Sequence, residues 1–164
     1  MSALYAIVAY IILVRLAELI LAARNTRRLK ARGAVETGAR HYPLFVALHA
    51  GWLVAMLLAI PPQTPAGVSL VGVFAALQVV RLWVILSLGE RWTTRVVVLP
   101  GTPLVKRGPY RFLRHPNYAV VAGEIAVVPL IFGAWEIALL FSALNLVLLR
   151  HRIRVENAAL GRGG

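Results

Sequence analysis

Long apolar stretches separated by shorter polar segments are the main feature of this chain. Several of the apolar stretches approach the ~20 residues that an α-helix needs to cross the hydrocarbon core of a bilayer. The pattern therefore predicts an all-α, polytopic integral membrane protein that has the lipid bilayer as a partner. We place five transmembrane helices at Ala3–Ala23, Pro43–Ile60, Gly67–Leu88, Tyr118–Gly133 and Ala134–Leu149.

The last two predicted helices are short for membrane spans. Pro129 and Gly133 lie close to the point where they meet, and proline and glycine are the residues that most strongly interrupt a helix. We therefore expect a tight helical hairpin here rather than one long span. No polar segment exceeds about 30 residues, so we expect a single membrane-embedded domain over residues 1–164.

The basic residues are distributed unevenly between the connections. The chain is 60% hydrophobic but carries 18 Lys and Arg against 6 acidic residues, a net charge of +12. All of these cations except Arg15 and Arg81 follow the first, third or fifth predicted helix, whereas connection 61–66 and the turn near Gly133 contain none. Because basic connections stay in the cytoplasm, we expect an inner-membrane protein. Its N-terminus would lie outside, and its C-terminus and basic segments would lie inside.

The same distribution argues against two other classes of function. A basic protein can bind nucleic acid, but topology already accounts for the cations and no recognition motif is present, so we expect no nucleic-acid partner. The chain has no cysteine, and its histidines lack the spacing of metal ligands, so we expect no metal site.

Arg15, Glu18, Arg81 and Glu124 are charged residues that lie inside the apolar stretches. Arg15 and Glu18 lie one helical turn apart, a spacing that lets them pair and anchor helix packing. Arg81 either extends to the interface or orients an anionic group in a buried cavity. Glu124 has no basic residue within reach on its own helix, and an intramembrane carboxylate is a functional candidate by default. The alternative is a structural Glu124, hydrogen-bonded to a neighbouring helix or paired with Arg81 or Arg15.

Two further patterns favour packing or solvation when they are taken alone. His49, Trp52 and Met56 recur at helical spacing, which is more typical of a packed face than of a ligand site. Arg152 and Glu156 lie four residues apart on the cytoplasmic continuation of the last helix. They gain functional meaning only if a ligand binds beside them.

The segment from Gly108 to Tyr118 places prolines, aromatic rings, arginines and a histidine between two apolar helices. A plain connector needs none of these, so we expect a binding site here. The segment belongs to an ordered set of motifs: Leu88-Gly89, Trp92-Thr93, Gly108-Pro109-Tyr110-Arg111, Arg114-His115-Pro116-Asn117-Tyr118, Arg152-Ile153, Glu156 and Leu160. This set, over residues 88–160, resembles the isoprenylcysteine carboxyl methyltransferase family of integral membrane enzymes.

The resemblance implies S-adenosylmethionine as the cofactor, bound on the cytoplasmic side. The residues that it assigns to the cofactor pocket are Trp92, Tyr110, His115, Pro116 and Tyr118. It places Arg152 and Glu156 near the reacting end of the cofactor as catalytic candidates. We add Glu124 as a third candidate, because a lipidic methyl acceptor that arrives from the bilayer would meet it. Positioning and water exclusion would then supply much of the catalytic effect.

The Arg114–Tyr118 motif followed by Glu124-Ile125, together with the ending Arg152–Asn157, looks most like a bacterial branch of the family that O-methylates alkylpyrones. Val120 departs from the family pattern, which commonly has glycine there, and Glu156-Asn157 replaces a common pair of glutamates. We therefore predict a methyltransferase for a small lipidic acceptor such as an alkylpyrone or alkylresorcinol. The alternatives are methylation of a prenylcysteine carboxylate, methylation of a phospholipid amine, or a non-catalytic membrane transport or structural protein.

Overall fold

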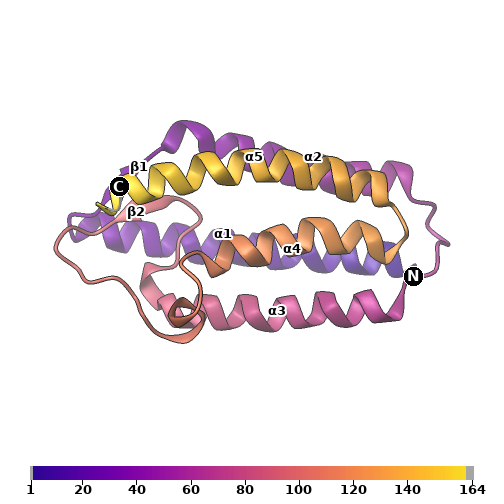
Figure 1. Cartoon of the computed structure of the whole chain (residues 1–164), viewed down its shortest axis with the longest axis horizontal. Coiled ribbons are helices and arrows are strands. Elements are labelled where there is room, and N and C mark those ends of the chain that lie inside the picture. Colours follow the sequence, from indigo (N-terminus) through magenta and orange to yellow (C-terminus); the bar gives the residue numbers. More distant parts are fainter. Residues whose placement is uncertain (1, 162–164) are drawn as a thin grey trace.

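Five long helices run side by side along one axis in the computed structural model, which describes residues 2–161 (Figure 1). Their bounds are α1 Ala3–Ala31, α2 Tyr42–Ala59, α3 Val68–Leu88, α4 Pro116–Ile131 and α5 Trp135–Ala159. The shorter elements of the described chain are β1 Val35–Thr37, β2 Val96–Val98 and the 3₁₀ turns η1 Ala39–His41, η2 Gly89–Arg91 and η3 Gly108–Arg111. The predicted all-α class is confirmed, and a small β-ribbon is added to it.

Three of these helical segments are long and apolar enough to cross a membrane. They are α1, α2 and α3 extended through η2, with mean hydropathies of 2.3, 1.8 and 2.1 over their most apolar windows. α4 is a shorter apolar helix. The beginning of α1 and the end of α5 lie at opposite ends of the bundle (Figure 1). The chain is therefore a helical membrane protein, while the number of spans remains a prediction of five.

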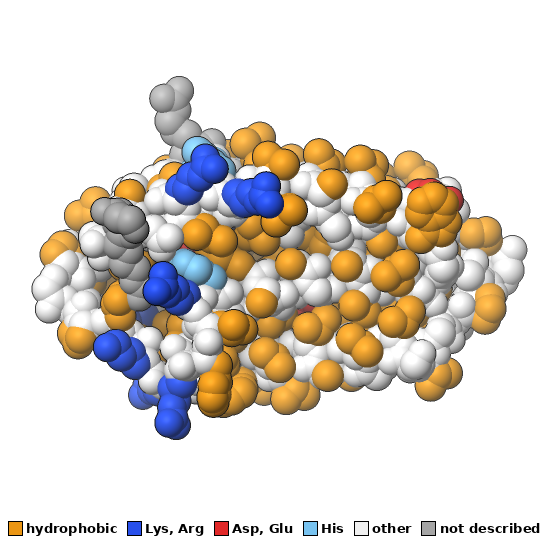
Figure 2. All heavy atoms as spheres, viewed as in Figure 1, with side chains coloured by type: hydrophobic (Ala, Val, Ile, Leu, Met, Phe, Trp, Pro, Cys, Tyr) orange, Lys and Arg blue, Asp and Glu red, His pale blue; other side chains and the backbone are white. Residues whose placement is uncertain are grey.

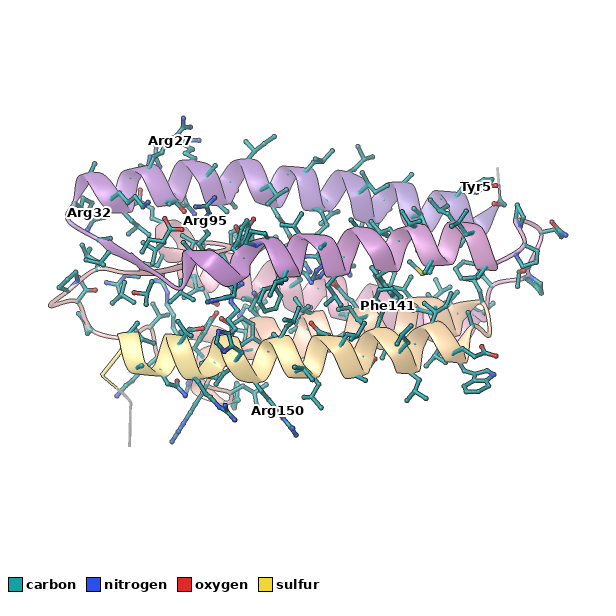
Figure 3. The ribbon with its side chains drawn as sticks, turned by 90° about the horizontal axis from the view of Figure 1, so that it is seen from above. Tyr5, Arg27, Arg32, Arg95, Phe141 and Arg150 are labelled. Carbon is teal, nitrogen blue, oxygen red and sulfur yellow. The ribbon has the colours of Figure 1, made fainter. Side chains whose placement is uncertain are left out.

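The basic side chains gather at the end of the bundle that carries β1 and β2, whereas hydrophobic side chains dominate the rest of the visible face (Figure 2). Figure 3 shows the same separation, with Arg27, Arg32 and Arg95 at that end and Tyr5 at the opposite end. We call the former the basic end. The predicted grouping of cations holds in the described part of the chain, and Arg162 lies outside it.

Helix α1 continues to Ala31, well beyond the predicted boundary at Ala23. Arg28 and Lys30 lie in its last turn, where cations interact favourably with the negative end of the helix dipole. Asn25 and Leu29 in this extension are only 3% and 2% exposed. The polar continuation is helical because it packs against the connection that follows α3, a contact that hydropathy along α1 does not indicate.

The predicted hairpin between α4 and α5 is confirmed. α4 ends at Ile131, and the chain reverses through Gly133, whose φ of +71° is in the left-handed region that favours glycine. The backbone N–H of Gly133 donates to the Leu130 carbonyl at 3.0 Å, and that of Ala134 donates to the Pro129 carbonyl at 3.1 Å. These bonds satisfy carbonyl groups at the end of α4, as a helix C-cap requires.

A two-stranded antiparallel ribbon closes the basic end. β1 pairs with β2 so that Glu36 lies opposite Val97. The Glu36 carboxylate accepts hydrogen bonds from Lys30 at 2.5 Å and from Arg95 at 2.8 Å. The Lys30 bond is the largest of the influences that lower the pKa of Glu36 below its ordinary value. The sequence did not predict this ribbon because each strand is only three residues long and gives no usable periodicity.

The main hydrophobic core fills the half of the bundle away from the basic end. Trp52 and Met56 belong to it and are 1% and 0% exposed, so the packing interpretation is confirmed for both. Phe141 of α5 packs toward α2 (Figure 3) at Gly51, where an added Cβ would lie 3.7 Å from the Phe141 ring. The close-packed core therefore lies away from the basic end, where the polar connections gather.

Candidate functional site

A pocket of about 190 Å³ opens at the basic end, where the long connection between α3 and α4 meets the last turns of α5. We call it the basic-end pocket. The predicted site residues that line it are Trp92, Tyr110, His115, Tyr118, Arg152 and Glu156. Tertiary structure thus gathers residues that are up to 64 positions apart, from Trp92 to Glu156, around one opening.

A side chain of α1 fixes the position of Trp92. α3 ends at Leu88, and Gly89, with a φ of +56°, starts the turn that follows. The side-chain amide of Asn25 donates to the carbonyl oxygens of Gly89 at 3.2 Å and Trp92 at 2.8 Å. Trp92 is 2% exposed and packs in a second hydrophobic cluster with Val84. The buried Asn25 therefore fixes the start of the pocket wall.

The η3 turn brings Tyr110 to the pocket by packing closely on the end of α3. Gly108 has a φ of +58°, and a Cβ there would lie 2.0 Å from Ser87 Oγ and 3.1 Å from Trp83 Nε1. Only glycine fits both the backbone conformation and the space. Tyr110 comes two residues after Gly108. Its pKa is raised above the ordinary value, mainly by burial and to a smaller extent by the negative charge of Glu156. Tyr110 thus stays a neutral, largely buried aromatic wall at physiological pH.

Three predicted residues form one hydrogen-bonded unit. The Tyr118 hydroxyl donates to Glu156 Oε2, and Arg152 Nε donates to the same hydroxyl at 2.9 Å. Arg152 Nη2 donates to the Thr94 carbonyl at 2.6 Å, and its guanidinium lies 5.1 Å from the Phe45 ring centroid. Arg152 is 8% exposed. These contacts hold Arg152 between α2, α4 and the connection before β2.

His115 completes the wall beside this unit. Its ring stacks on that of Tyr118, with centroids 5.3 Å apart and an interplanar angle of 13°. His115 Nδ1 lies 3.8 Å from Glu156 Oε1, beyond hydrogen-bond distance. The Glu156 carboxylate therefore uses Oε2 to hold Tyr118, while Oε1 accepts no hydrogen bond from the described residues.

Two buried polar atoms in the pocket wall have no hydrogen-bond partner in the described structure. They are the indole nitrogen of Trp92 and the side-chain carbonyl oxygen of Asn117, and both residues line the pocket. Buried polar atoms are rarely left unpaired, because losing water without a replacement costs about 1–3 kcal/mol. The residues that line the pocket therefore include one donor and one acceptor without a protein partner among the described residues.

Two predicted site residues lie outside the pocket. Pro116 is the first residue of α4, where proline is favoured, and it faces an apolar groove between α3 and α4 instead. Glu124 is buried deeper in the bundle and does not line the pocket. Neither residue is therefore placed to contact a ligand in this pocket.

Glu124 belongs to a buried ion cluster that joins α1, α3 and α4. Its carboxylate accepts hydrogen bonds from Gln78 Nε2 at 2.7 Å and Arg81 Nε at 2.8 Å, and Oε2 also accepts from Arg15 and Arg81. Glu18 accepts from Arg15 at 2.6 Å and from Arg81 at 3.0 Å. The paired interpretations of Arg15, Glu18 and Glu124 agree with these contacts. Arg81 is 3% exposed, so it does not extend to the interface.

Sequence reasoning missed part of the pocket. Asn117 lies inside the Arg114–Tyr118 motif, so the motif could have indicated it as a pocket residue. Arg91 and Arg95 line the opening, but in the sequence they are only two of many basic residues. Val97 and Val98 reach the pocket through β2, and the Thr94 carbonyl, which holds Arg152, is a backbone group. No side-chain pattern could have indicated either contribution.

Comparisons with known proteins give one family match and two uncharacterized relatives. The sequence model of the isoprenylcysteine carboxyl methyltransferase family matches residues 70–162. The uncharacterized protein YpbQ of Bacillus subtilis is 40% identical over 158 residues, which cover 94% of each chain. An uncharacterized protein of Haemophilus influenzae is 26% identical over 157 residues, 93% of this chain and 91% of that one. No solved structure matches the chain.

Proposed function

The chain belongs to the isoprenylcysteine carboxyl methyltransferase family, a family of methyltransferases, and from this premise we propose that it binds S-adenosylmethionine in the basic-end pocket. We propose further that it O-methylates a small lipidic acceptor there. The observation that carries the proposal is the pocket itself. It collects the motif residues from three separate parts of the chain and leaves the polar atoms of Trp92 and Asn117 without protein partners.

The residues of the pocket fit the proposed cofactor. S-adenosylmethionine, when bound, supplies an electrophilic methyl group on a positively charged sulfur. Trp92 offers an N–H donor and Asn117 a carbonyl acceptor, which suit the polar edges of the adenosyl group. The faces of Tyr110 and His115 offer apolar surface for its ring. The free oxygen of Glu156 offers a negative charge for the cationic groups of the cofactor.

Arg152 acts in this proposal as a positioning residue rather than a catalytic one. Its donors are directed to the Tyr118 hydroxyl and the Thr94 carbonyl, which ties α5 to α4 and to the pocket wall. Tyr118 in turn fixes one oxygen of Glu156. Methyl transfer to an oxygen nucleophile depends strongly on holding the reacting groups in line. The Glu156 carboxylate belongs to α5 and is held by Tyr118 of α4, so two elements fix its position, which suits that requirement.

The charge around the opening favours an acidic acceptor. Arg91, Arg95 and Arg114 line the pocket, and Glu156 is its single carboxylate among the described residues. An alkylpyrone has an acidic ring hydroxyl and an alkylresorcinol has weakly acidic ones, and each ring carries an alkyl tail. The anion formed when such a hydroxyl loses its proton would be attracted to these guanidinium groups. A cationic amine acceptor would be repelled. A prenylcysteine carboxylate is also anionic, so the same charge leaves it as the second candidate.

A pair of tryptophan variants tests cofactor binding. Trp92→Phe removes the unpartnered indole N–H at the pocket, and Trp52→Phe removes an equally unpartnered one in the apolar core. We expect wild type and Trp52→Phe to bind S-adenosylhomocysteine equally in calorimetry. Trp92→Phe should bind about fivefold to tenfold more weakly, the value of one hydrogen bond.

Two results would contradict the assignment. If purified, monodisperse wild-type protein does not bind S-adenosylhomocysteine, the methyltransferase proposal fails for this chain. If Trp92→Phe binds as tightly as wild type, the indole does not face the cofactor. Turnover of an alkylpyrone compared with a farnesylcysteine analogue then decides between the two acceptor classes.

A further inference from the structure

A second hollow lies next to the basic-end pocket and is entirely apolar in its lining. This groove has a volume of about 260 Å³ and runs between α3 and α4 beneath η3. We call it the α3–α4 groove. Leu77, Val80 and Trp83 form its α3 side, and Trp83 is 48% exposed. The groove therefore opens on the outer surface of α3, which faces lipid because this helix is apolar enough to span the membrane.

A single segment separates this groove from the basic-end pocket. Along residues 109–120 the side chains alternate between the two hollows. The residues that face the groove are Pro109, Phe112, Leu113, Pro116, Ala119 and Val120. Those that face the pocket are Tyr110, Arg114, His115, Asn117 and Tyr118. The same stretch of chain is thus the polar wall of one site and the apolar wall of the other.

The groove has a defined depth. Trp83 lies near its basic end and Leu77 six residues deeper, a distance of roughly 9 Å at 1.5 Å per helical residue. Below Leu77 the two helices close, because a Cβ on Gly123 would lie only 3.1 Å from Leu77 Cδ2. An extended hydrocarbon chain fits along such a groove, whereas a bulky ring system would have to leave it where α3 and α4 meet.

We propose that the α3–α4 groove binds the alkyl chain of the methyl acceptor, an inference that rests on the proposed function. Consecutive residues carry the argument: Leu113 lines the groove and Arg114 lines the pocket. A chain that lies along Leu113 brings its acidic head group to the Arg114 guanidinium, at the edge of the candidate cofactor pocket. The groove thereby selects acceptors with a flexible apolar chain, and Leu77 limits how much of that chain is held.

A matched pair of substitutions on α4 tests the groove. Ala119 lines it, and Ala122, one turn further along the same helix, is also exposed but does not line it. Ala119→Phe should reduce kcat/KM for a long-chain alkylpyrone by about tenfold to a hundredfold, since it displaces several methylene groups. Turnover of the methyl-substituted pyrone and affinity for S-adenosylhomocysteine should not change. Ala122→Phe should behave as wild type, and Leu77→Ala should improve turnover of longer chains.

Photolabelling tests the same site without turnover. A long-chain alkylpyrone with a diazirine in its tail, added to protein in phosphatidylcholine nanodiscs, should label peptides 77–83 and 112–120. An excess of unlabelled long-chain pyrone should suppress this labelling. Labelling that is spread over the lipid-facing helices, or that the pyrone does not suppress, would show that ordinary bilayer lipid fills the groove and would overturn the proposal.

The kinetic outcomes separate the two proposals. If wild type binds no S-adenosylhomocysteine, the proposed function fails, and the photolabelling still reports on the groove. If wild type is active and Ala119→Phe and Ala122→Phe affect long and short chains alike, only the groove assignment fails.

Discussion

At the scale of single residues, Glu124 illustrates how a tertiary contact changes the meaning of a side chain. Alone on an apolar helix, an intramembrane carboxylate is a functional candidate. In the folded protein, Arg15, Gln78 and Arg81 donate to both of its oxygens. The cluster holds two guanidinium and two carboxylate groups and is electrically neutral as a unit. A carboxylate with its acceptor sites already occupied is poorly placed to receive a proton from a substrate.

We therefore predict that Glu124→Gln mainly reduces stability. Removing one negative charge leaves an uncompensated guanidinium group among side chains that are 4% to 24% exposed. Breaking a buried ion pair in this way typically costs about 3–5 kcal/mol. Thermal unfolding in detergent should show a clear loss of stability for Glu124→Gln and little change for the exposed Glu136→Gln.

The double variant Arg15→Gln with Glu124→Gln supplies the control, because it restores neutrality and should recover part of the loss. The catalytic interpretation of Glu124 would be supported by the opposite pattern. In that case Glu124→Gln would unfold like wild type and bind S-adenosylhomocysteine normally, yet it would lose turnover of an alkylpyrone.

At the scale of elements, η3 is the structure on which both hollows depend. It is one short turn, but it supplies Tyr110 to the basic-end pocket and Pro109 and Phe112 to the α3–α4 groove. Gly108 sets its position against Ser87 and Trp83 at the end of α3. Phe112 is 75% exposed, so its outer edge contributes little packing of its own. The close approach at Gly108 is therefore the main constraint on this element.

Two glycine variants of the same connection test this dependence. Gly101 also has a positive φ, +71°, but a Cβ there would meet nothing within 4 Å. Gly101→Ala should show only backbone strain of about 1–2 kcal/mol and near-normal affinity for S-adenosylhomocysteine. Gly108→Ala adds a clash 2.0 Å from Ser87 Oγ, so we expect calorimetry to show at least about a tenfold weaker affinity.

If both glycine variants bind S-adenosylhomocysteine equally well, η3 does not position the cofactor site. The double variant Gly108→Ala with Ser87→Gly removes the atoms that an added Cβ would meet at 2.0 and 3.0 Å. It should recover part of the affinity. Failure to recover would assign the effect to the backbone conformation at Gly108 and to the remaining contact with Trp83 Nε1 at 3.1 Å.

At the scale of the whole molecule, the bundle separates an apolar half from a basic end, and the candidate site lies at the basic end. Apart from Arg15 and Arg81, the cations of the described chain lie in the last turns of α1 and α5 or in the connections that follow α1 and α3. One orientation places all of these segments in the cytoplasm. We predict that reporter fusions after residues 35, 105 and 164 report a cytoplasmic location, and that one at residue 63 reports an external location. A cytoplasmic residue 63 would contradict the five-span topology and would separate the parts of the site.

The sequence by itself determined the helical membrane architecture, the hairpin at Gly133 and the motif residues of the pocket. The first two features depend on local properties, namely apolar length and turn chemistry. The resemblance of the ordered motifs over residues 88–160 to a known family predicted Trp92, Tyr110, His115 and Tyr118 as pocket residues. The sequence also paired Arg152 with Glu156 by helical spacing, although it could not show that Tyr118 lies between them.

Only the tertiary structure decided which partners the charged and polar residues have. Hydrogen bonds across the bundle join residues 34 to 109 positions apart, such as Arg152 with Tyr118 and Arg15 with Glu124, and no periodicity along one helix contains that information. The same reason applies to Pro116, whose place on the groove side depends on how α3 packs against α4. Interactions between residues that are near one another in the sequence determine whether a segment forms a helix, a strand or a turn. Desolvation of paired charges and close packing between helices determine where each side chain points.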